Sequence, residues 1–263
     1  TIQTMKMLCY EFQDLEPSVL SLLRSSADEL APLLCARMDE IFADAGAAVV
    51  AGRPHNNRAC KYVLNLMANV FNVPSLACSV SQPTLRGALS TVLCCLVDDR
   101  IVGAPEGVAL LRALNLLVMK ALENSDRTHV FASLIPLMLR PHERLAELSP
   151  YSKYESMWYE LVVKCTIKAT KALQADVASV DLRTLLVHIH QFFETLGPEE
   201  LRRRGAREDK PVRMVKTILH EVCKAKGREV YAYVDGIPGA DLDPAMRPHI
   251  FPYIDLNLST MGL

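Results

Sequence analysis

Apolar residues recur at steps of three and four positions along almost the whole chain. This spacing is typical of amphipathic α-helices, because residues three and four apart share one face of a helix. No segment alternates apolar and polar residues over the length of a strand, and glycine is scarce, at 11 of 263 residues. The pattern therefore predicts an all-α protein. The clearest stripes run through Leu20, Leu23, Leu30, Leu34, Met38 and Ile41, and through Leu85, Leu89, Val92 and Leu96.

Prolines and capping residues indicate where the helices begin. Proline favours the first helical turn, whose N–H groups have no partner within the helix. Asp209, two residues before Pro211, has the position of an N-cap. The prolines expected in first turns are Pro17, Pro54, Pro83 and Pro105. The predicted helices cover residues 3–12, 17–24, 26–44, 55–72, 83–98, 105–123, 126–139, 152–174, 181–196, 198–204, 210–226, 228–234 and 244–260.

Helices of roughly 15 to 20 residues joined by short turns are typical of stacked hairpins, each burying its apolar face only against its neighbours. We therefore predict an α-solenoid of HEAT-like helical hairpins, in preference to a closed helical bundle. Literal repetition is weak, but two apolar runs each carry a lone asparagine, Asn65 or Asn115. Each buried amide is expected to bond the backbone of a neighbouring helix.

The segment 140–155 is charged, contains two prolines and shows little apolar periodicity. It predicts a long loop or hinge at 140–153 between two parts of one continuous solenoid. We expect residues 1–263 to form a single HEAT-like helical domain.

The composition indicates a folded protein with free thiols and no membrane-spanning helix. Half of the residues are hydrophobic and 22% are charged, which is enough apolar material for a substantial core. The eight cysteines lie within helical patterns without paired spacing, which indicates buried free thiols in a reducing compartment. No uncharged apolar run reaches the length of about 18 residues that a membrane span needs. The chain opens on Thr1, so we expect it to be a segment of a larger protein.

The sequence lacks the common signatures of catalysis. It has no nucleophile elbow, P-loop or dinucleotide-binding glycine pattern, and "GAPEG" at 103–107 lacks the required glycine spacing. His188 and His190 are two positions apart on a predicted helix, so they point in different directions and cannot share one ion. Trp158 is interpreted as a core residue in preference to an exposed anchor for a partner. We predict no catalytic residues, no metal and no cofactor, and therefore no enzyme.

Positive charge is concentrated near the end of the chain. Residues 199–228 hold ten Lys and Arg against five Asp and Glu, a net charge of +5, whereas the rest of the chain carries −6. Four arginines within six positions exceed what solubility requires, and the planar guanidinium group suits carboxylates and phosphates. The pI of about 6.6 and the absence of aromatic residues between Phe193 and Tyr231 argue against nucleic acid.

We therefore expect an acidic protein to bind here, the alternative being a solvated helix face. In the helix predicted at 210–226, Val212, Val215, Leu219 and Val222 form the buried stripe. The predicted partner-binding residues are Arg202, Arg203, Arg204, Arg207, Lys210, Arg213, Lys216 and Lys224.

Five segments carry a resemblance to a known family. They are "RACKYVLN" (58–65), "LNLLVMKALENSDRT" (114–128), "LVVKCTIKATKALQ" (161–174), "RRRGAREDKPVRMVKTILHEVCKAKG" (202–227) and "PYIDLNLSTM" (252–261). In this order they resemble the C-terminal region of the TOG family of microtubule polymerases, the ch-TOG and minispindles family, and most closely its plant-type members. The resemblance implies a HEAT-like targeting domain in the cytoplasm, at microtubules and spindle poles. It implies TACC-type coiled coils and the γ-tubulin complex as acidic partners, with tubulin as a further candidate.

One departure from the family bears on tubulin. TOG domains that bind tubulin present a tryptophan at their first inter-helix turn, whereas no tryptophan precedes Trp158 here. Arg53, Arg58 and Lys61 form a secondary candidate contact, or pack across the next hairpin. The sequence thus favours a non-catalytic interaction domain. The alternatives are direct binding to tubulin or the microtubule lattice by the turn edge, and a structural domain that contacts the rest of its parent chain.

Overall fold

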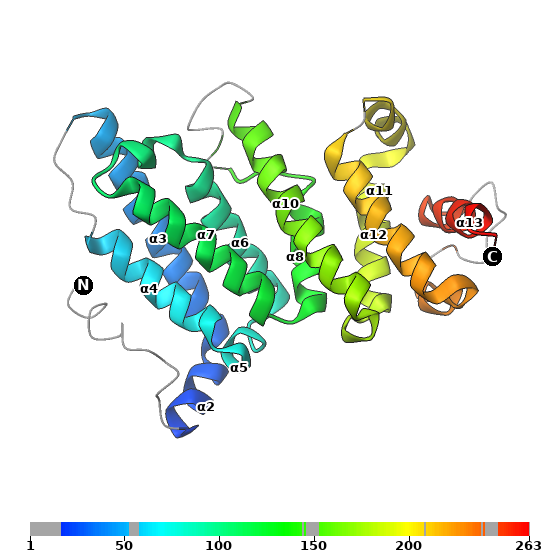
Figure 1. Cartoon of the computed structure of the whole chain (residues 1–263), viewed down its shortest axis with the longest axis horizontal. Coiled ribbons are helices and arrows are strands. Elements are labelled where there is room, and N and C mark those ends of the chain that lie inside the picture. Colours follow the sequence, from blue (N-terminus) through cyan, green and yellow to red (C-terminus); the bar gives the residue numbers. More distant parts are fainter. Residues whose placement is uncertain are drawn as a thin grey trace. The chain divides into compact units, whose positions relative to one another are not determined.

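The computed structural model describes residues 17–52, 58–143, 145, 153–207, 209–237, 239 and 247–262. All regular structure among these residues is helical, and they contain no β-strand (Figure 1). The predicted all-α class is therefore confirmed. None of the helices in this part of the chain is long and apolar enough to cross a membrane.

The helices follow one another with short connections, and most predicted helix ends agree with the observed ones to within a few residues. The observed order is α2 (Pro17–Ser25), α3 (Ala27–Val50), α4 (Arg58–Asn72), α5 (Pro74–Ala77), α6 (Gln82–Val97), the 3₁₀-helix η2 (Asp99–Gly103), α7 (Gly107–Asn124), α8 (Arg127–Leu137), α10 (Lys153–Ala175), the 3₁₀-helix η3 (Val177–Ser179), α11 (Leu182–Ala206), α12 (Lys210–Lys226), the 3₁₀-helix η4 (Gly227–Tyr233) and α13 (Ile250–Thr260).

The largest differences from the predicted helix ends lie at the C-terminus of α3, which extends to Val50 beyond the predicted residue 44, and at the start of α13. Pro105 does not open a helix, because Glu106 adopts a left-handed conformation and α7 begins at Gly107. The short elements α5, η2 and η3 were not predicted, and the helix expected at 228–234 is the 3₁₀-helix η4. The helix expected from 244 begins at Ile250. The helix predicted at 3–12, Pro54 and most of the hinge predicted at 140–153 lie outside the described residues.

The chain divides into two compact units. The first is made of Thr1–Ser133 with His142–Trp158, and the second of Leu134–Pro141 with Tyr159–Leu263. In the first unit, α3 packs on α4 and α6, and α7 also packs on α4 and α6. Each helix therefore contacts the other helix of its own hairpin and the equivalent helix of the next hairpin (Figure 1). This is the packing of stacked hairpins, so the predicted HEAT-like solenoid class is confirmed.

Hydrogen bonds between elements reveal a repeat that the sequence hardly shows. In the first unit, Ser81 N–H donates to Oδ1 of Asp28, 53 residues earlier, at 2.8 Å. Thr91 Oγ1 donates to Oδ2 of Asp39, 52 residues earlier, at 3.2 Å. Equivalent positions of successive hairpins thus stand about 50 residues apart, a spacing within the range of helical solenoid repeats.

The two asparagines expected to bond between helices do not do so. Asn65 and Asn115 are exposed, and Nδ2 of Asn115 donates to the carbonyl oxygen of Leu111 in its own helix at 3.0 Å. That prediction is wrong, because both residues lie on the outer side of their hairpins. The expected bond is made instead by Asn124 at the end of α7, whose Nδ2 donates to the carbonyl oxygen of Phe71 at 2.8 Å.

The core contains the residues expected of it. Trp158 is fully buried, which confirms its assignment to the core. All cysteines in the described residues are free thiols, and most of them are buried. Burial raises the pKa of Cys35 to about 12, and the pKa of Cys223 to about 11.

In the second unit, α12 packs against α11, η4 and α13. The helices predicted at 181–196 and 198–204 form one element, α11, which is kinked at Gly197. Gly197 has a φ of 70°, a left-handed value that glycine adopts without a steric penalty, and Pro198 follows it. The kink sets the direction of the last turns of α11, which carry the arginines Arg202, Arg203 and Arg204.

Candidate partner-binding surface

The basic corner is the turn between α11 and α12, with the charged side chains Arg202, Arg203, Arg204, Arg207, Lys210 and Arg213. Its first three arginines stand in the last turns of α11, where cations interact favourably with the negative end of the helix dipole. Arg207 follows as the C-cap, and Lys210 opens α12. Four arginines therefore lie at the C-terminal end of α11 and at its C-cap.

Asp209 fixes the start of α12. Its Oδ1 accepts a hydrogen bond from the N–H of Val212 at 3.0 Å, and Pro211 stands in the first turn. The predicted N-cap is therefore confirmed. The predicted buried stripe of Val212, Val215, Leu219 and Val222 is confirmed as well, since all four are at most 2% exposed.

The Asp209→Ala substitution is expected to lower the free energy of unfolding by about 1 kcal/mol, because the N–H of Val212 loses its capping acceptor. Asp209→Asn is the matched control, since the amide oxygen still caps the helix while the charge is removed. Thermal unfolding followed by circular dichroism measures both variants. Equal losses in the two would show that the charge, and not the cap, stabilises this end of α12.

Glu200 forms ion pairs with two of the arginines. Arg203 donates to both carboxylate oxygens of Glu200, each at 2.6 Å, and Nε of Arg204 donates to Oε1 at 2.6 Å. These hydrogen bonds, with Arg203 the larger contributor, lower the pKa of Glu200 to about 2. The Arg203 side chain nevertheless remains 54% exposed, whereas that of Arg204 is only 24% exposed. Arg203 is therefore accessible to a partner, while Arg204 mainly supports the corner.

The remaining side chains of the corner point into solvent. Arg202, Arg207 and Arg213 are exposed and form no ion pair within the described part of the chain. The Lys210 side chain is 56% exposed and bonds Oε1 of Glu160 on α10 at 2.8 Å. The corner therefore keeps most of its positive charge at the surface.

Two of the predicted partner-binding residues lie away from the corner. Lys216 is half-buried, with Nζ 4.5 Å from the centre of the Tyr253 ring of α13, so its charge is used in a cation–π contact. Lys224 is exposed but lies about 21 Å along α12 from Lys210, at 1.5 Å per residue. The structure thus gathers the residues from Arg202 to Arg213 and leaves these two lysines outside the corner.

The secondary contact is only partly described. Arg53 lies outside the described residues, Arg58 is exposed at the start of α4, and Lys61 pairs with Glu106 at the start of α7. Lys61 therefore packs across to the next hairpin, which was one of the two alternatives.

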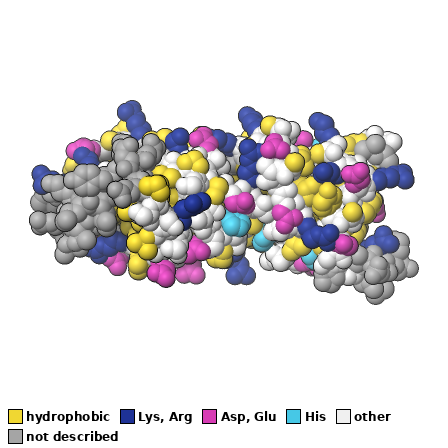
Figure 2. Space-filling model, turned by 90° about the horizontal axis from the view of Figure 1, so that it is seen from below, with side chains coloured by type: hydrophobic (Ala, Val, Ile, Leu, Met, Phe, Trp, Pro, Cys, Tyr) yellow, Lys and Arg dark blue, Asp and Glu magenta, His cyan; other side chains and the backbone are white. Residues whose placement is uncertain are grey.

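No metal-binding cluster occurs among the described residues. They contain no group of three or more His, Cys, Asp or Glu side chains able to hold a metal ion. His188 and His190 are both half-buried on α11. On the face drawn in Figure 2, the basic side chains that the structure describes are interspersed with acidic ones and form no continuous stripe.

Comparison with known proteins gives the chain its relatives. It is 38% identical over its whole length to a segment of Protein MOR1 from Arabidopsis thaliana, and 39% identical to a segment of Protein MOR1 from Oryza sativa. The chain belongs to the MOR1 family. Protein mini spindles from Drosophila melanogaster is 23% identical over 67% of the chain. The resemblance to plant-type members of the TOG family is thereby confirmed.

The relationship covers only a part of these relatives. This MOR1-family chain spans 13% of the length of each plant protein and 8% of the length of mini spindles. No family profile and no solved structure matches the chain.

Sequence reasoning missed the surface of α10 next to the corner. Lys164 and Lys171 are exposed on this helix, together with Ile167. The signal was present as an apolar residue within a row of lysines spaced three and four apart, in the segment "KCTIKATK" at 164–171. The pairing of α10 with α12, which turns this row into one side of a groove, could not be derived from that spacing.

Proposed function

We propose that this MOR1-family chain is a non-catalytic interaction and targeting domain of a microtubule polymerase. In this proposal it works in the cytoplasm at microtubules and spindle poles, where it docks acidic proteins of the microtubule machinery through the basic corner. TACC-type coiled coils and the γ-tubulin complex are the proposed partners. The proposal assigns the chain no cofactor, metal or nucleic acid.

The observation that carries this proposal is the exposure of the corner. Arg202, Arg207 and Arg213 are exposed without an ion pair in the described residues, and Arg203 keeps 54% of its side chain exposed beside Glu200. An arginine cluster of this kind steers an acidic surface toward itself and offers bidentate hydrogen bonds to its carboxylates. The Asp209 cap and the kink at Gly197 hold the cluster on folded helices.

The Arg202→Glu/Arg207→Glu variant is expected to weaken binding of an acidic TACC-type coiled coil or of the γ-tubulin complex by about tenfold or more. Both side chains are exposed, so the fold should be unchanged. Wild-type binding should also weaken steeply with salt, because the Debye length falls from about 10 Å at 0.1 M to about 3 Å at 1 M. Fluorescence anisotropy or calorimetry with the purified chain measures both effects.

Arg86→Glu/Arg112→Glu is the matched control, with the same change in charge at exposed positions on α6 and α7. It should leave binding within about threefold of wild type, since no cluster is removed. If both variants lost the same affinity for the partner, binding would depend on the net charge of the chain and not on the basic corner. Unchanged affinity of the corner variant for both partners would refute the assignment.

Direct binding to tubulin or the microtubule lattice remains the alternative, and the exposed Arg58 is the observation that favours it. Co-sedimentation of the purified chain with microtubules, compared with an Arg58→Glu variant, separates this alternative from partner docking. A structural role against the rest of the parent chain would instead give binding to the N-terminal part of that chain in a pull-down.

A further inference from the structure

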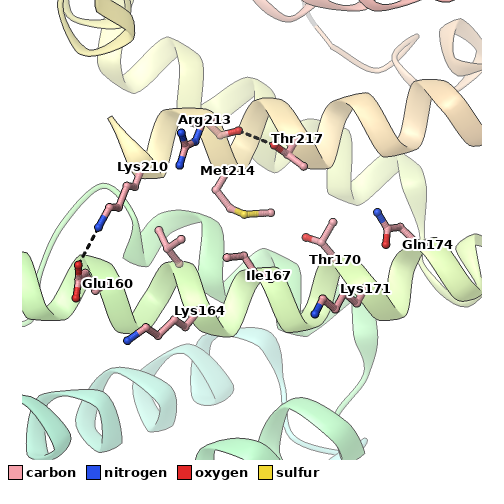
Figure 3. A pocket seen from close by; sticks show the side chains of 11 residues that line it. Glu160, Lys164, Ile167, Thr170, Lys171, Gln174, Lys210, Arg213, Met214 and Thr217 are labelled. Atoms are coloured by element: carbon pink, nitrogen blue, oxygen red, sulfur yellow. Dashed lines mark hydrogen bonds and ion pairs between the residues drawn. The ribbon is translucent and has the colours of Figure 1, made fainter. Parts of the chain in front are cut away.

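A groove of about 500 Å³ lies between α10 and α12, within the second unit (Figure 3). Its residues on α10 recur at three and four residue steps, so they form one face of that helix. The α10 side is Glu160, Val163, Lys164, Ile167, Thr170, Lys171 and Gln174, and the α12 side is Lys210, Arg213, Met214 and Thr217.

The floor of the groove is apolar. Ile167 is 43% exposed although it lies between two helices, while Val163 and Met214 beside it are 9% and 7% exposed. Figure 3 shows Met214 pointing from α12 toward α10, on the side where Ile167 lies. Apolar surface at the bottom of a hollow stays in contact with water until a ligand covers it, so its burial would favour binding.

The rim is strongly cationic. Lys164, Lys171, Lys210 and Arg213 line it, and Glu160 is the one carboxylate among the lining residues. Glu160 bonds Lys210 at 2.8 Å, whereas Lys164, Lys171 and Arg213 form no ion pair within the part of the chain that the structure describes. Three cations of the rim are therefore available to an acidic ligand on either side of the apolar floor.

We propose that this groove binds an acidic amphipathic helix of a partner protein. The helix places its apolar face on Ile167 and Met214, and its carboxylates lie against the lysines and the arginine of the rim. The lining positions of α10 from Glu160 to Gln174 extend for about 21 Å at 1.5 Å per residue, which is the length of a helix of about four turns. This inference rests on the proposed function and deepens it, because the rim shares Lys210 and Arg213 with the basic corner.

Other occupants fit the groove less well. A bilayer surface requires apolar side chains that protrude, whereas Ile167 and Met214 lie in a hollow. A second copy of this chain would bring an identical cationic rim against the first, and like charges would repel. Nucleic acid would need stacking platforms, and no aromatic side chain lines the groove.

The test uses the purified 263-residue chain and a fluorescein-labelled helical peptide of about 18 residues, built from Leu, Glu and Ala with the leucines on one helix face. Fluorescence anisotropy should show saturable binding. Ile167→Glu and Lys164→Glu/Lys171→Glu should each weaken it by about tenfold or more. A peptide of the same composition with the leucines spread around the helix should bind about tenfold more weakly, because it has no apolar face to place on the floor.

Matched controls separate the groove from general effects. Leu116→Glu changes another exposed apolar residue, on α7, and Arg86→Glu/Arg112→Glu makes the same change in charge as the lysine pair. Both should bind the peptide within about threefold of wild type, and circular dichroism verifies that all variants are folded. The inference is overturned if the groove variants bind the peptide like wild type, or if the two peptides bind equally.

Two further measurements address the rival occupants. Binding to phosphatidylserine-containing vesicles without binding to the peptide, abolished by Ile167→Glu, would overturn the inference in favour of a membrane. A dimer in size-exclusion chromatography with light scattering, also abolished by Ile167→Glu, would overturn it in favour of self-association. A chain that is monomeric, does not bind vesicles and binds the peptide supports an acidic partner helix as the ligand of the groove.

Failure of the groove inference can be distinguished from failure of the proposed function of the basic corner. Arg202→Glu/Arg207→Glu leaves the groove intact, so this variant should still bind the peptide while losing the acidic partner. If the groove variants retain full affinity for the peptide but the corner variant loses the partner, the groove inference fails alone. If the corner variant keeps the partner, the corner assignment fails whatever the peptide does.

Discussion

The Gly107→Ala variant is expected to be less stable than wild type by roughly 3 kcal/mol. Gly107 opens α7 shortly after η2, and a methyl group at this position would overlap the carbonyl oxygen of Ile101 and lie 2.9 Å from that of Val102. Backbone atoms cannot rotate away as the end of a flexible side chain can, so η2 or the first turn of α7 would have to shift. Urea denaturation followed by far-ultraviolet circular dichroism measures the free energy of unfolding.

Gly87→Ala is the control for this prediction, and its expected effect has the opposite sign. Gly87 lies inside α6, and apart from its chain neighbours and the adjacent backbone of α6, no atom lies within 4 Å of the position of an added methyl group. Alanine there should stabilise the helix by about 0.5 to 1 kcal/mol, because glycine loses more backbone entropy on folding. A Gly107→Ala protein as stable as Gly87→Ala would contradict the close approach of η2 to α7.

The Trp158→Ala variant is expected to lose about 3 to 5 kcal/mol of unfolding free energy. Trp158 is 0% exposed and is the largest fully buried side chain of the described residues. Its removal loses the transfer free energy of the indole and leaves a cavity that the surrounding helices fill only in part. Urea denaturation followed by circular dichroism is the suitable measurement, because the variant lacks the single tryptophan of the chain.

Leu116→Ala and Trp158→Phe are the controls for the loss of unfolding free energy in Trp158→Ala. Leu116 is 59% exposed on α7, so its truncation should change stability by less than about 0.5 kcal/mol. Trp158→Phe keeps part of the buried volume and should lose less than the alanine variant. If Trp158→Ala unfolded like wild type, the side chain would not be part of the core, and its role as an anchor for a partner would return.

The basic corner and the groove are neighbouring parts of one surface. They share Lys210 and Arg213 at the start of α12, and the N-cap Asp209 holds this start in place. A partner helix seated in the groove would have one end close to the corner. The groove variants and the corner variants therefore test separate parts of one binding surface. The groove has an apolar floor with a cationic rim, whereas the corner is cationic only.

Much of the helical structure could be predicted from the sequence, because the signals act within a few residues of the chain. The stripe through Val212 and Val215 identified the buried face of α12, and Asp209 with Pro211 identified its first turn. The same reasoning failed at Pro105, where the left-handed conformation of Glu106 delays the start of α7. A proline is compatible with a first turn but does not require one.

For the candidate site, the sequence predicted which charged residues lie close together in the chain, but not which of them are exposed or paired. The sequence placed Arg202, Arg203, Arg204 and Arg207 at one turn, but their exposure depends on Glu200, which binds two of them. Lys216 carries the same charge as Lys210, yet it lies over the ring of Tyr253 because α13 packs on that side of α12. No local pattern distinguishes these two lysines.

The sequence by itself determined the all-α class, most helix ends, the core position of Trp158 and the concentration of arginines between α11 and α12. Only the tertiary structure decided that hairpins repeat about every 50 residues, that Asn124 and not Asn115 bonds the preceding hairpin, and that α10 and α12 form a groove. The reason is physical. Periodicity and capping depend on contacts within one or two helical turns, whereas the exposure and pairing of a side chain depend on which distant helix packs beside it.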